Sequence, residues 1–340
     1  MSIEFRIPDL LETVSTYRKP LNTNFDALDA GFQKWIDDAA FLSTSHKKSW
    51  KHAELPLLIA RAFPDADAPH LQVSLESMMM FLILEQLTDT PATSIVSKKW
   101  AHEFVEALQQ AEAPQTKKEG PAAVLQLLGT KVISAIDPPY RPGYIASNVL
   151  LAEGVVQEAL DREQYDEKNP ISLETYLTTR RKSIGILPFH DLARWAWKLD
   201  FPDGSHVLEN PHIQLMVQAS VDLVLLANDI YSYRKEYLED GAKHNYVTVA
   251  MHDPSTPIKA GDIQAAIDYT VTQFAAALAR YKENQALLPF GNDADLSAKV
   301  ERYSELMMDS VAGNIEWSVA CKRYSLFPDE AARKAGLVKI

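Results

Sequence analysis

Three oxygen-bearing side chains recur at four-residue intervals in one long apolar segment: Asn228, Ser232 and Glu236. On a helix this spacing places them in one row, because residues four apart share a face. Amide, hydroxyl and carboxylate oxygens are ligands that suit Mg²⁺, and the neighbouring Lys235 suits a phosphate oxygen. The competing interpretation is that the row simply turns out to solvent at the helix end. Spacing alone slightly favours this second interpretation.

A pair of acidic side chains ends a second apolar segment. Glu85 and Asp89 continue the helical row of Phe81, and Pro91 closes the segment. The helix dipole disfavours anions at a C-terminal end, so we expect a compensating cation there. A metal ion would supply that charge. A solvated helix end is the alternative, and for one acidic pair alone it is favoured.

Basic side chains gather in two further segments of this acidic chain. Arg180, Arg181 and Lys182 are consecutive, and Arg323 precedes Tyr324 near the C-terminus. A guanidinium presents a fork of donors that matches phosphate oxygens, although a basic run is usually a solvated face. Together the four segments are typical of metal-assisted departure of a diphosphate in an apolar cavity, whose aromatic faces would stabilise a cation. The sequence contains no Walker loop and no HExxH motif.

The elements that must position these side chains are predicted to be helices. Helical periodicity dominates from residue 24 to about residue 325, and prolines mark the breaks. No repeat or shift of composition indicates a second domain, so we expect one all-α domain of about ten helices. The predicted helices cover residues 24–42, 54–62, 70–89, 95–113, 119–136, 143–163, 171–182, 187–199, 209–238, 259–283 and 293–321.

Composition narrows the classes of partner. The chain has 340 residues and a net charge of −12, which disfavours general binding to nucleic acid because phosphate is repelled. Cys321 is the single cysteine, so neither an intrachain disulfide nor a cysteine-based zinc site is expected. We expect no signal peptide, no membrane span and a cytoplasmic location, since the apolar runs are too short to cross a bilayer.

The four segments resemble the motifs of class I terpene synthases. Residues 228–236 match the NDxxSxxKE motif without a mismatch, and residues 85–89 lie where the aspartate-rich motif of that family is found. Residues 180–185 are similar to the RRxTxG segment, and residues 323–324 are similar to the C-terminal RY pair. The resemblance covers nearly the whole chain and is closest in character to fungal, basidiomycete-type sesquiterpene cyclases.

The resemblance implies a fold and a metal centre. The fold would be one isoprenoid-synthase α-domain over residues 1–340, with an N-terminal segment at 1–20, a C-terminal tail at 326–340 and helices around a central apolar cavity. Three Mg²⁺ ions would bind with the substrate diphosphate. Asn228, Ser232 and Glu236 would hold one ion. Glu85, together with Asp89, would hold the other two.

The resemblance also implies the roles of the remaining residues. Arg181, four residues before Gly185, would sense the diphosphate, and Lys235, Arg323 and Tyr324 would complete its binding. Gly185 would point a carbonyl at the substrate, and Phe81 is the best aromatic candidate for the cavity wall. The substrate would be the prenyl diphosphate farnesyl diphosphate, ionised to an allylic cation and cyclised to a sesquiterpene with release of diphosphate.

One departure from the family pattern concerns the aspartate-rich motif, which normally begins with Asp followed by Asp or Glu. Here it reads Glu85-Gln86. We expect activity to survive, because Glu85 still supplies a carboxylate. Three alternatives remain: a synthase acting on geranyl diphosphate, one forming a linear terpene alcohol, and a non-catalytic prenyl-diphosphate-binding protein. The sequence also leaves open the product skeleton, quenching of the cation by water, and assembly as a homodimer.

Overall fold

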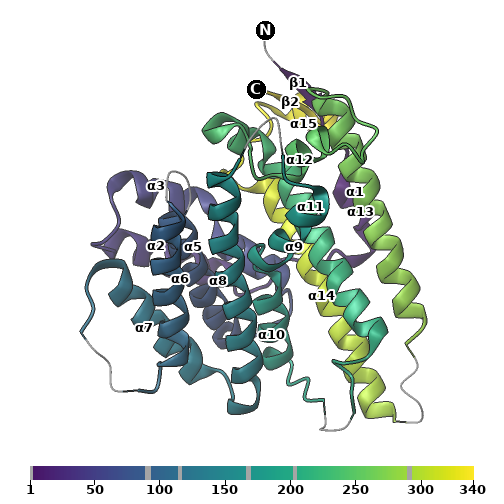
Figure 1. The fold of residues 1–340 in the computed structure, drawn as a ribbon. Helices are drawn as coiled ribbons and strands as arrows, with labels where there is room; N and C mark the ends of the chain where they lie inside the picture. Colours follow the sequence, from purple (N-terminus) through teal and green to yellow (C-terminus); the bar gives the residue numbers. More distant parts are fainter. Residues whose placement is uncertain (1–2, 89–92, 114–116, 166–169, 202–204, 289–292) are drawn as a thin grey trace.

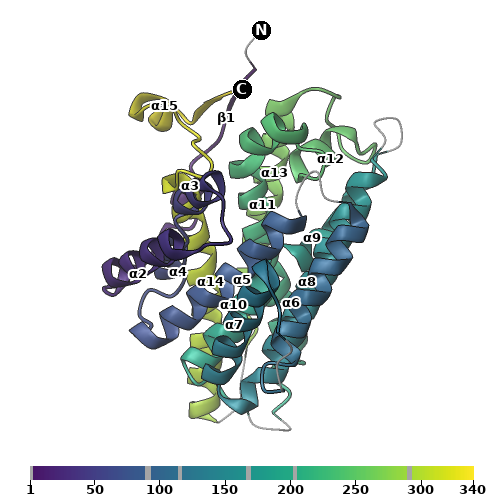
Figure 2. The same ribbon diagram turned by 90° about the vertical axis from the view of Figure 1, so that its left-hand side faces the viewer.

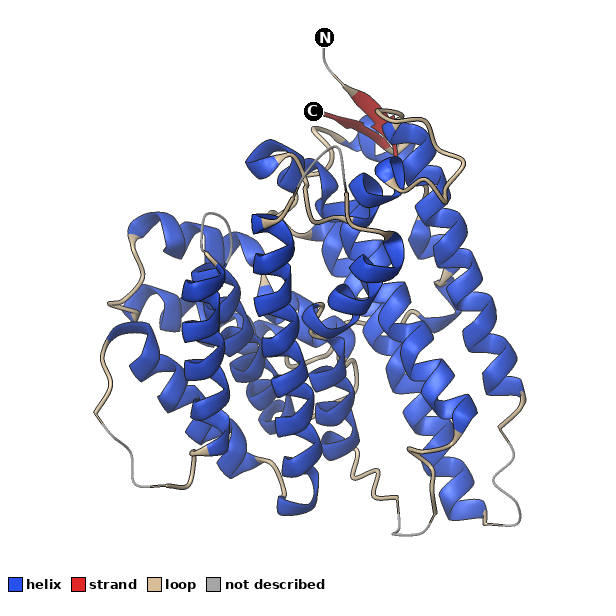
Figure 3. Ribbon diagram, viewed as in Figure 1, coloured by secondary structure: helices blue, strands red, loops and turns tan. Residues whose placement is uncertain are grey.

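Nearly all of the secondary structure is helical in the computed structural model, which describes residues 3–88, 93–113, 117–165, 170–201, 205–288 and 293–340 (Figures 1 and 3). The all-α class is therefore confirmed. In chain order the elements are β1 (Glu4–Arg6), α1 (Leu10–Thr13), η1 (Ser15–Tyr17), α2 (Phe25–Asp38), α3 (Thr44–Ala53), α4 (Leu55–Ala62), α5 (Ala68–Thr88), α6 (Ser94–Gln109), α7 (Gly120–Ala135), η2 (Pro138–Tyr140), α8 (Arg141–Glu163), α9 (Leu173–Ser183), α10 (Ile186–Ala196), α11 (Pro211–Asp240), α12 (Tyr246–His252), α13 (Ile263–Ala286), α14 (Ala294–Ala320), α15 (Glu330–Ala335) and β2 (Leu337–Lys339).

Helix α11 is the central element for the site. It begins where the Asn210 side chain accepts hydrogen bonds from two backbone amides of the first turn, with Pro211 at the first helical position. It ends at Gly241, whose φ of +83° is the left-handed conformation that glycine adopts freely. Among the described residues, α11 alone is long and apolar enough to cross a membrane, but 72% of its apolar window is buried inside the protein. It is therefore a core helix.

The long helices around α11 form two groups. Helices α13 and α14 pack against α11, whereas α5, α6, α7 and α8 pack against one another in a second group (Figures 1 and 2). Helix α10 contacts both groups, and α9 joins α8 to α11. Helix α14 passes very close to α4 at Gly313, where an added Cβ would lie 2.6 Å from the backbone nitrogen of Ala62. That contact fixes the rotation of α14 about its axis.

The two ends of the described chain meet in a small antiparallel sheet. Glu4 pairs with Lys339, Phe5 with Val338 and Arg6 with Leu337, and Figure 1 shows the pair beside α13. The backbone oxygen of Lys339 also accepts a hydrogen bond of 2.7 Å from the Nε of Arg234 on α11. The C-terminal strand is thus tied to the helix that carries the oxygen row.

The sequence prediction missed several short elements. Helix α3 buries only Trp50 and Ala53, so its apolar periodicity is weak. Helix α12 has the opposite pattern, with six of its seven residues buried and no polar face. The strands are three residues long and pair across the whole chain, so no local hairpin signal exists. The long helices follow their predicted ranges closely because each is a long run of helix-forming residues, apolar on one face or, in α5, on nearly all faces, that is bounded by breaking residues.

Candidate active site

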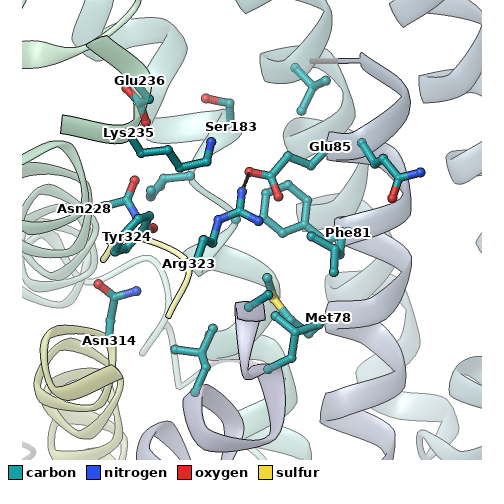
Figure 4. A pocket seen from close by; sticks show the side chains of 18 of the residues that line it. Met78, Phe81, Glu85, Ser183, Asn228, Lys235, Glu236, Asn314, Arg323 and Tyr324 are labelled. Carbon is teal, nitrogen blue, oxygen red and sulfur yellow. Dashed lines mark hydrogen bonds and ion pairs between the residues drawn. The ribbon is translucent and has the colours of Figure 1, made fainter. Parts of the chain in front are cut away.

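A cavity of about 700 Å³ opens among helices of both groups. This volume lies within the usual range of small-molecule sites, about 300 to 1,000 Å³. Much of the wall is apolar or aromatic, whereas charged side chains gather on one side of it (Figure 4). Ten residues singled out by sequence line it: Phe81, Glu85, Gln86, Arg180, Gly185, Asn228, Lys235, Glu236, Arg323 and Tyr324.

The oxygen row of α11 is aligned as its spacing predicts. Asn228 Oδ1 accepts a hydrogen bond of 2.8 Å from Arg180 Nη2, and Asn228 Nδ2 donates one of 2.8 Å to the Tyr324 hydroxyl. Ser232 is buried, and its Oγ makes no hydrogen bond of regular geometry. Glu236 accepts a hydrogen bond of 2.9 Å from Asn245 Nδ2. Asn228 and Glu236 therefore reach the cavity wall, whereas Ser232 lies buried between them and is not among the described lining residues.

The Glu236 carboxyl has an unusual environment. Burial, and after it the charge of Asp229, raise its pKa to about 7. The nearby hydroxyl of Ser232 and the amide of Asn245 offset this only in part. An anion at this position is thus costly unless a cation accompanies it.

The opposite wall, at the end of α5, is differently equipped. Glu85 Oε1 accepts a hydrogen bond of 2.7 Å from Arg323 Nη2, which forms an ion pair across the cavity (Figure 4). Gln86 is occupied elsewhere, since its Oε1 accepts a bond of 2.6 Å from Trp50 Nε1 and its Nε2 lies 3.2 Å from His46 Nδ1. The predicted ligand Asp89 lies outside the described residues. Within those residues, the α5 motif presents a single carboxylate.

Of the two adjacent arginines on α9, Arg180 lines the cavity, and the diphosphate-sensing role expected of Arg181 stays a prediction. Arg180 lines the wall and donates to Asn228 Oδ1, and to Asp229 and Glu158 at 3.2 Å each. Burial alone would lower the pKa of its guanidinium, but the two carboxylates raise it, so the charge is retained. Arg181 does not line the cavity within the described part of the chain. It binds Asp222 with two hydrogen bonds of 2.7 and 3.0 Å.

Two further predicted residues take defined positions in the wall. Lys235 Nζ forms an ion pair of 2.6 Å with Glu239, one turn further along α11. Gly185 joins α9 to α10 with a φ of +77°. An added Cβ there would lie 3.3 Å from the Phe81 ring, so Gly185 and Phe81 pack directly against each other. The backbone at Gly185 therefore reaches the cavity wall only because no side chain intervenes.

Helix α8 supplies wall residues that carried no motif. Glu158 and Arg162 lie one turn apart and line the cavity. Arg162 Nη2 donates to the backbone oxygen of Thr88 at 3.0 Å, which ties α8 to the end of α5. His244 lies 3.6 Å from Glu158. Burial would raise the pKa of Glu158, but His244 and Arg180 hold it below its usual value. A paired Glu and Arg at four-residue spacing is the signal that could have drawn attention to α8.

Asp229, the second residue of the α11 motif, has a structural position. It is buried and accepts hydrogen bonds from the Tyr176 hydroxyl on α9 and from the backbone nitrogen of Tyr246 at 2.9 Å. Asp229 therefore joins α9 and α12 to α11. This arrangement also holds Arg180 beside the oxygen row.

The oxygen donors fit a hard divalent cation. The buried Ser232 hydroxyl without a regular partner and the desolvated Glu236 carboxyl both favour a cation beside α11. Asn228 and Glu85 each already hold a guanidinium, so positive charge suits these positions as well. No group of three His, Cys, Asp or Glu residues arranged for a metal occurs in the part of the chain that the structure describes. A site here would instead combine amide, hydroxyl and carboxylate oxygens, with substrate or water completing it.

Known proteins resemble this chain over most of its length. The family model described as terpene synthase family 2, C-terminal metal binding, matches residues 76–280. Sesquiterpene synthase Agr1 of Cyclocybe aegerita is 25% identical over 94% of this chain and 88% of its own length. Delta(6)-protoilludene synthase of Armillaria gallica is 26% identical over 95% of this chain and 90% of its own length.

Solved structures share the fold at lower identity. The structure of a-eudesmol synthase is 19% identical with a TM-score of 0.75, over 88% of this chain and 96% of that one. Germacradien-4-ol synthase from Streptomyces citricolor is 18% identical with a TM-score of 0.71, over 88% of this chain and 95% of that one. These likenesses support the isoprenoid-synthase arrangement of helices around a cavity.

Proposed function

Since this chain belongs to terpene synthase family 2 and is a class I terpene synthase, we propose that it ionises farnesyl diphosphate with the help of Mg²⁺ and cyclises it to a sesquiterpene. The reaction would release diphosphate. The first curated relatives are named as sesquiterpene synthases, which supports a substrate of this class. A cavity of about 700 Å³ with a largely apolar wall suits a long prenyl chain.

The two walls would share the diphosphate end of the substrate. Asn228, Ser232 and Glu236 would hold one magnesium ion, and Glu85 with Asp89 would hold the others, three in all. Bound Mg²⁺ would neutralise the charge that develops on the departing diphosphate. The position of Asn228 and Glu236 across the cavity from Glu85 is the observation that carries this proposal.

The basic side chains of the wall would act on the leaving group. Arg180, Lys235 and Arg323 would donate to diphosphate oxygens, together with the Tyr324 hydroxyl. Donors placed where negative charge develops lower the barrier to breaking the carbon–oxygen bond. The electron pair of that bond would leave with the diphosphate, and an allylic cation would remain in the apolar part of the cavity.

The aromatic wall would then act on the cation. Phe81 and Trp317 line the cavity, and a ring face attracts positive charge. The Trp317 indole is held in place by a hydrogen bond of 2.8 Å from its Nε1 to the backbone oxygen of Ala53. A double bond of the chain would attack the cation, forming the ring, and loss of a proton or capture of water would end the reaction.

Purified protein incubated with farnesyl diphosphate and Mg²⁺ tests the proposal. We expect sesquiterpene products by gas chromatography–mass spectrometry and an equal amount of released diphosphate, both lost when the metal is chelated. Geranyl diphosphate in a parallel reaction would reveal whether a shorter substrate is preferred. Mg²⁺-dependent diphosphate binding without any product would contradict catalysis and favour a binding protein.

A further inference from the structure

An amide side chain on α14 has unmet hydrogen-bonding capacity inside the cavity wall. Asn314 lines the cavity, and its Oδ1 is buried without a hydrogen-bond partner among the described residues. A buried polar atom left unpaired costs about 1–3 kcal/mol. Figure 4 draws Asn314 below Asn228 and Tyr324, at the opposite end of this row from Lys235 and Glu236. In this view the amide therefore lies apart from the Lys235 ammonium and the Glu236 carboxylate.

The other polar side chains of α14 that line the cavity are hydrogen-bonded within the described part of the protein. Ser310, one turn earlier, donates to the backbone oxygen of Leu306 at 3.1 Å. Trp317, about one turn later, donates to the backbone oxygen of Ala53. Both also line the cavity. Asn314 differs from these two neighbours because its own helix and the adjoining α4 leave its carbonyl oxygen without a donor.

The backbone holds this amide at the cavity. Gly313 is pressed against α4, with a built Cβ only 2.6 Å from both Ala62 N and the carbonyl carbon of Arg61. Helix α14 cannot rotate there without a clash, so the next residue keeps its direction. The terminal torsion of an asparagine is soft. A half-turn about it would exchange the amide oxygen and nitrogen, so Asn314 can offer the cavity either an acceptor or a donor.

The hydrogen-bonding chemistry of the molecule in the cavity decides what can bind to the Asn314 amide. A prenyl chain carries no hydrogen-bonding atom beyond its diphosphate, which the charged side of the wall would hold. Water both donates and accepts, and it is small enough to share the cavity with a hydrocarbon. We propose that Asn314 binds a water molecule that captures the cyclised cation, so that the product is a sesquiterpene alcohol. This inference rests on the proposed function.

The proposed step balances as follows. The oxygen of the water donates an electron pair to the cationic carbon, and a carbon–oxygen bond forms. The resulting oxonium loses one proton to the released diphosphate, which is the nearest strong base that the reaction itself produces. The product is the neutral alcohol. Asn314 acts here as a positioning residue that accepts a hydrogen bond from the water before the attack.

Product analysis in water enriched with oxygen-18 tests this inference. The wild-type protein with farnesyl diphosphate and Mg²⁺ should give an alcohol that carries the label. Asn314→Leu, which keeps a branched side chain of the same length and removes the amide, should lower the alcohol share of total product by about tenfold or more. Ser310→Ala is the matched control, because it removes a polar atom of the same wall that is already satisfied, and its alcohol share should stay near the wild-type value.

The outcomes separate this inference from the proposed function. Hydrocarbon products alone from the wild-type protein, with diphosphate released, would overturn the water site and leave the cyclase intact. An unchanged alcohol share in Asn314→Leu would also overturn it. Absence of both product and diphosphate would contradict the proposed function itself, and the water site with it. The wild-type labelling result does not depend on whether any variant folds.

Discussion

The two walls that face the charged side of the cavity are built in different ways. On α11 the oxygens of Asn228, Ser232 and Glu236 come from one long helix whose rotation is fixed by packing on both sides. On α5 the described part of the motif offers Glu85 alone, 35% exposed at its side chain and held by Arg323. Gln86 is engaged with Trp50. The α11 wall is anchored on the buried Ser232 with Asn228 and Glu236 half-buried, whereas the half-buried Glu85 of the α5 wall is held by a side-chain contact.

This difference indicates that the two walls contribute unequally to metal binding. The α11 row gains most from a cation, because the Ser232 hydroxyl has no regular partner and the Glu236 carboxyl has already lost water. The α5 wall must exchange the Arg323 guanidinium for metal, so its contribution depends on what else enters the cavity. We therefore expect substitutions on α11 to reduce turnover most, and substitutions at Gln86 to act mainly on stability.

The largest effect is expected for Asn228→Ala. The change removes a proposed metal ligand and the partner of both Arg180 and Tyr324. Diphosphate release should fall by at least about 100-fold, measured in a coupled phosphate assay. Gln218→Ala, an exposed position on the same helix, is the control. Near-normal release by Asn228→Ala would remove the α11 row from the site.

The next comparison concerns the two adjacent arginines. Arg180→Gln should reduce turnover by about 10- to 100-fold, because Arg180 positions the amide of a proposed ligand. Arg181→Gln removes one of two arginines bound to Asp222, so it should lower the melting temperature more than the rate. Steady-state kinetics and thermal melting of both variants compare the loss of turnover with the loss of stability. A greater loss of turnover in Arg181→Gln than in Arg180→Gln would support Arg181 as the residue that senses the diphosphate.

Gln86 should matter for stability rather than chemistry. Gln86→Leu leaves the buried Trp50 indole nitrogen without an acceptor, which should cost about 1–3 kcal/mol in the free energy of unfolding. Gln86→Glu keeps an acceptor for Trp50 and should remain close to wild type in denaturant unfolding. A strong rise in turnover in Gln86→Glu would contradict this. It would mean that the α5 wall binds metal weakly because it lacks a second carboxylate at this position.

The smallest effect is expected at the glycine that adjoins Phe81 on α5. Gly185→Ala and Gly241→Ala both place a side chain at a positive φ, which costs about 1–2 kcal/mol. Gly241, at the end of α11, faces open space, whereas the new methyl at Gly185 would meet Phe81 at 3.3 Å. Chemical denaturation should therefore show the greater loss for Gly185→Ala. Equal losses in the free energy of unfolding would mean that the Phe81 ring moves aside at no cost and is not held rigidly in the cavity wall.

The sequence predicted the long helices and the α11 row because both depend on local periodicity. It did not reveal which of the adjacent residues Arg180 and Arg181 lines the cavity, because neighbours on a helix point about 100° apart and their environment depends on packing. Glu158, Arg162 and Asn314 escaped notice because their positions depend on how α8 and α14 pack. The sheet formed by β1 and β2 pairs residues more than 330 positions apart, which no local pattern reveals.

Calorimetric titration of Mg²⁺ and diphosphate into the folded protein tests most directly whether both walls bind one metal–diphosphate group. We predict binding that requires both components and that weakens by about tenfold or more in Asn228→Ala and, separately, in Glu85→Ala. Circular dichroism should show that both variants keep their helical content. Wild-type affinity in either variant would contradict a shared site, because one wall would then suffice without the other.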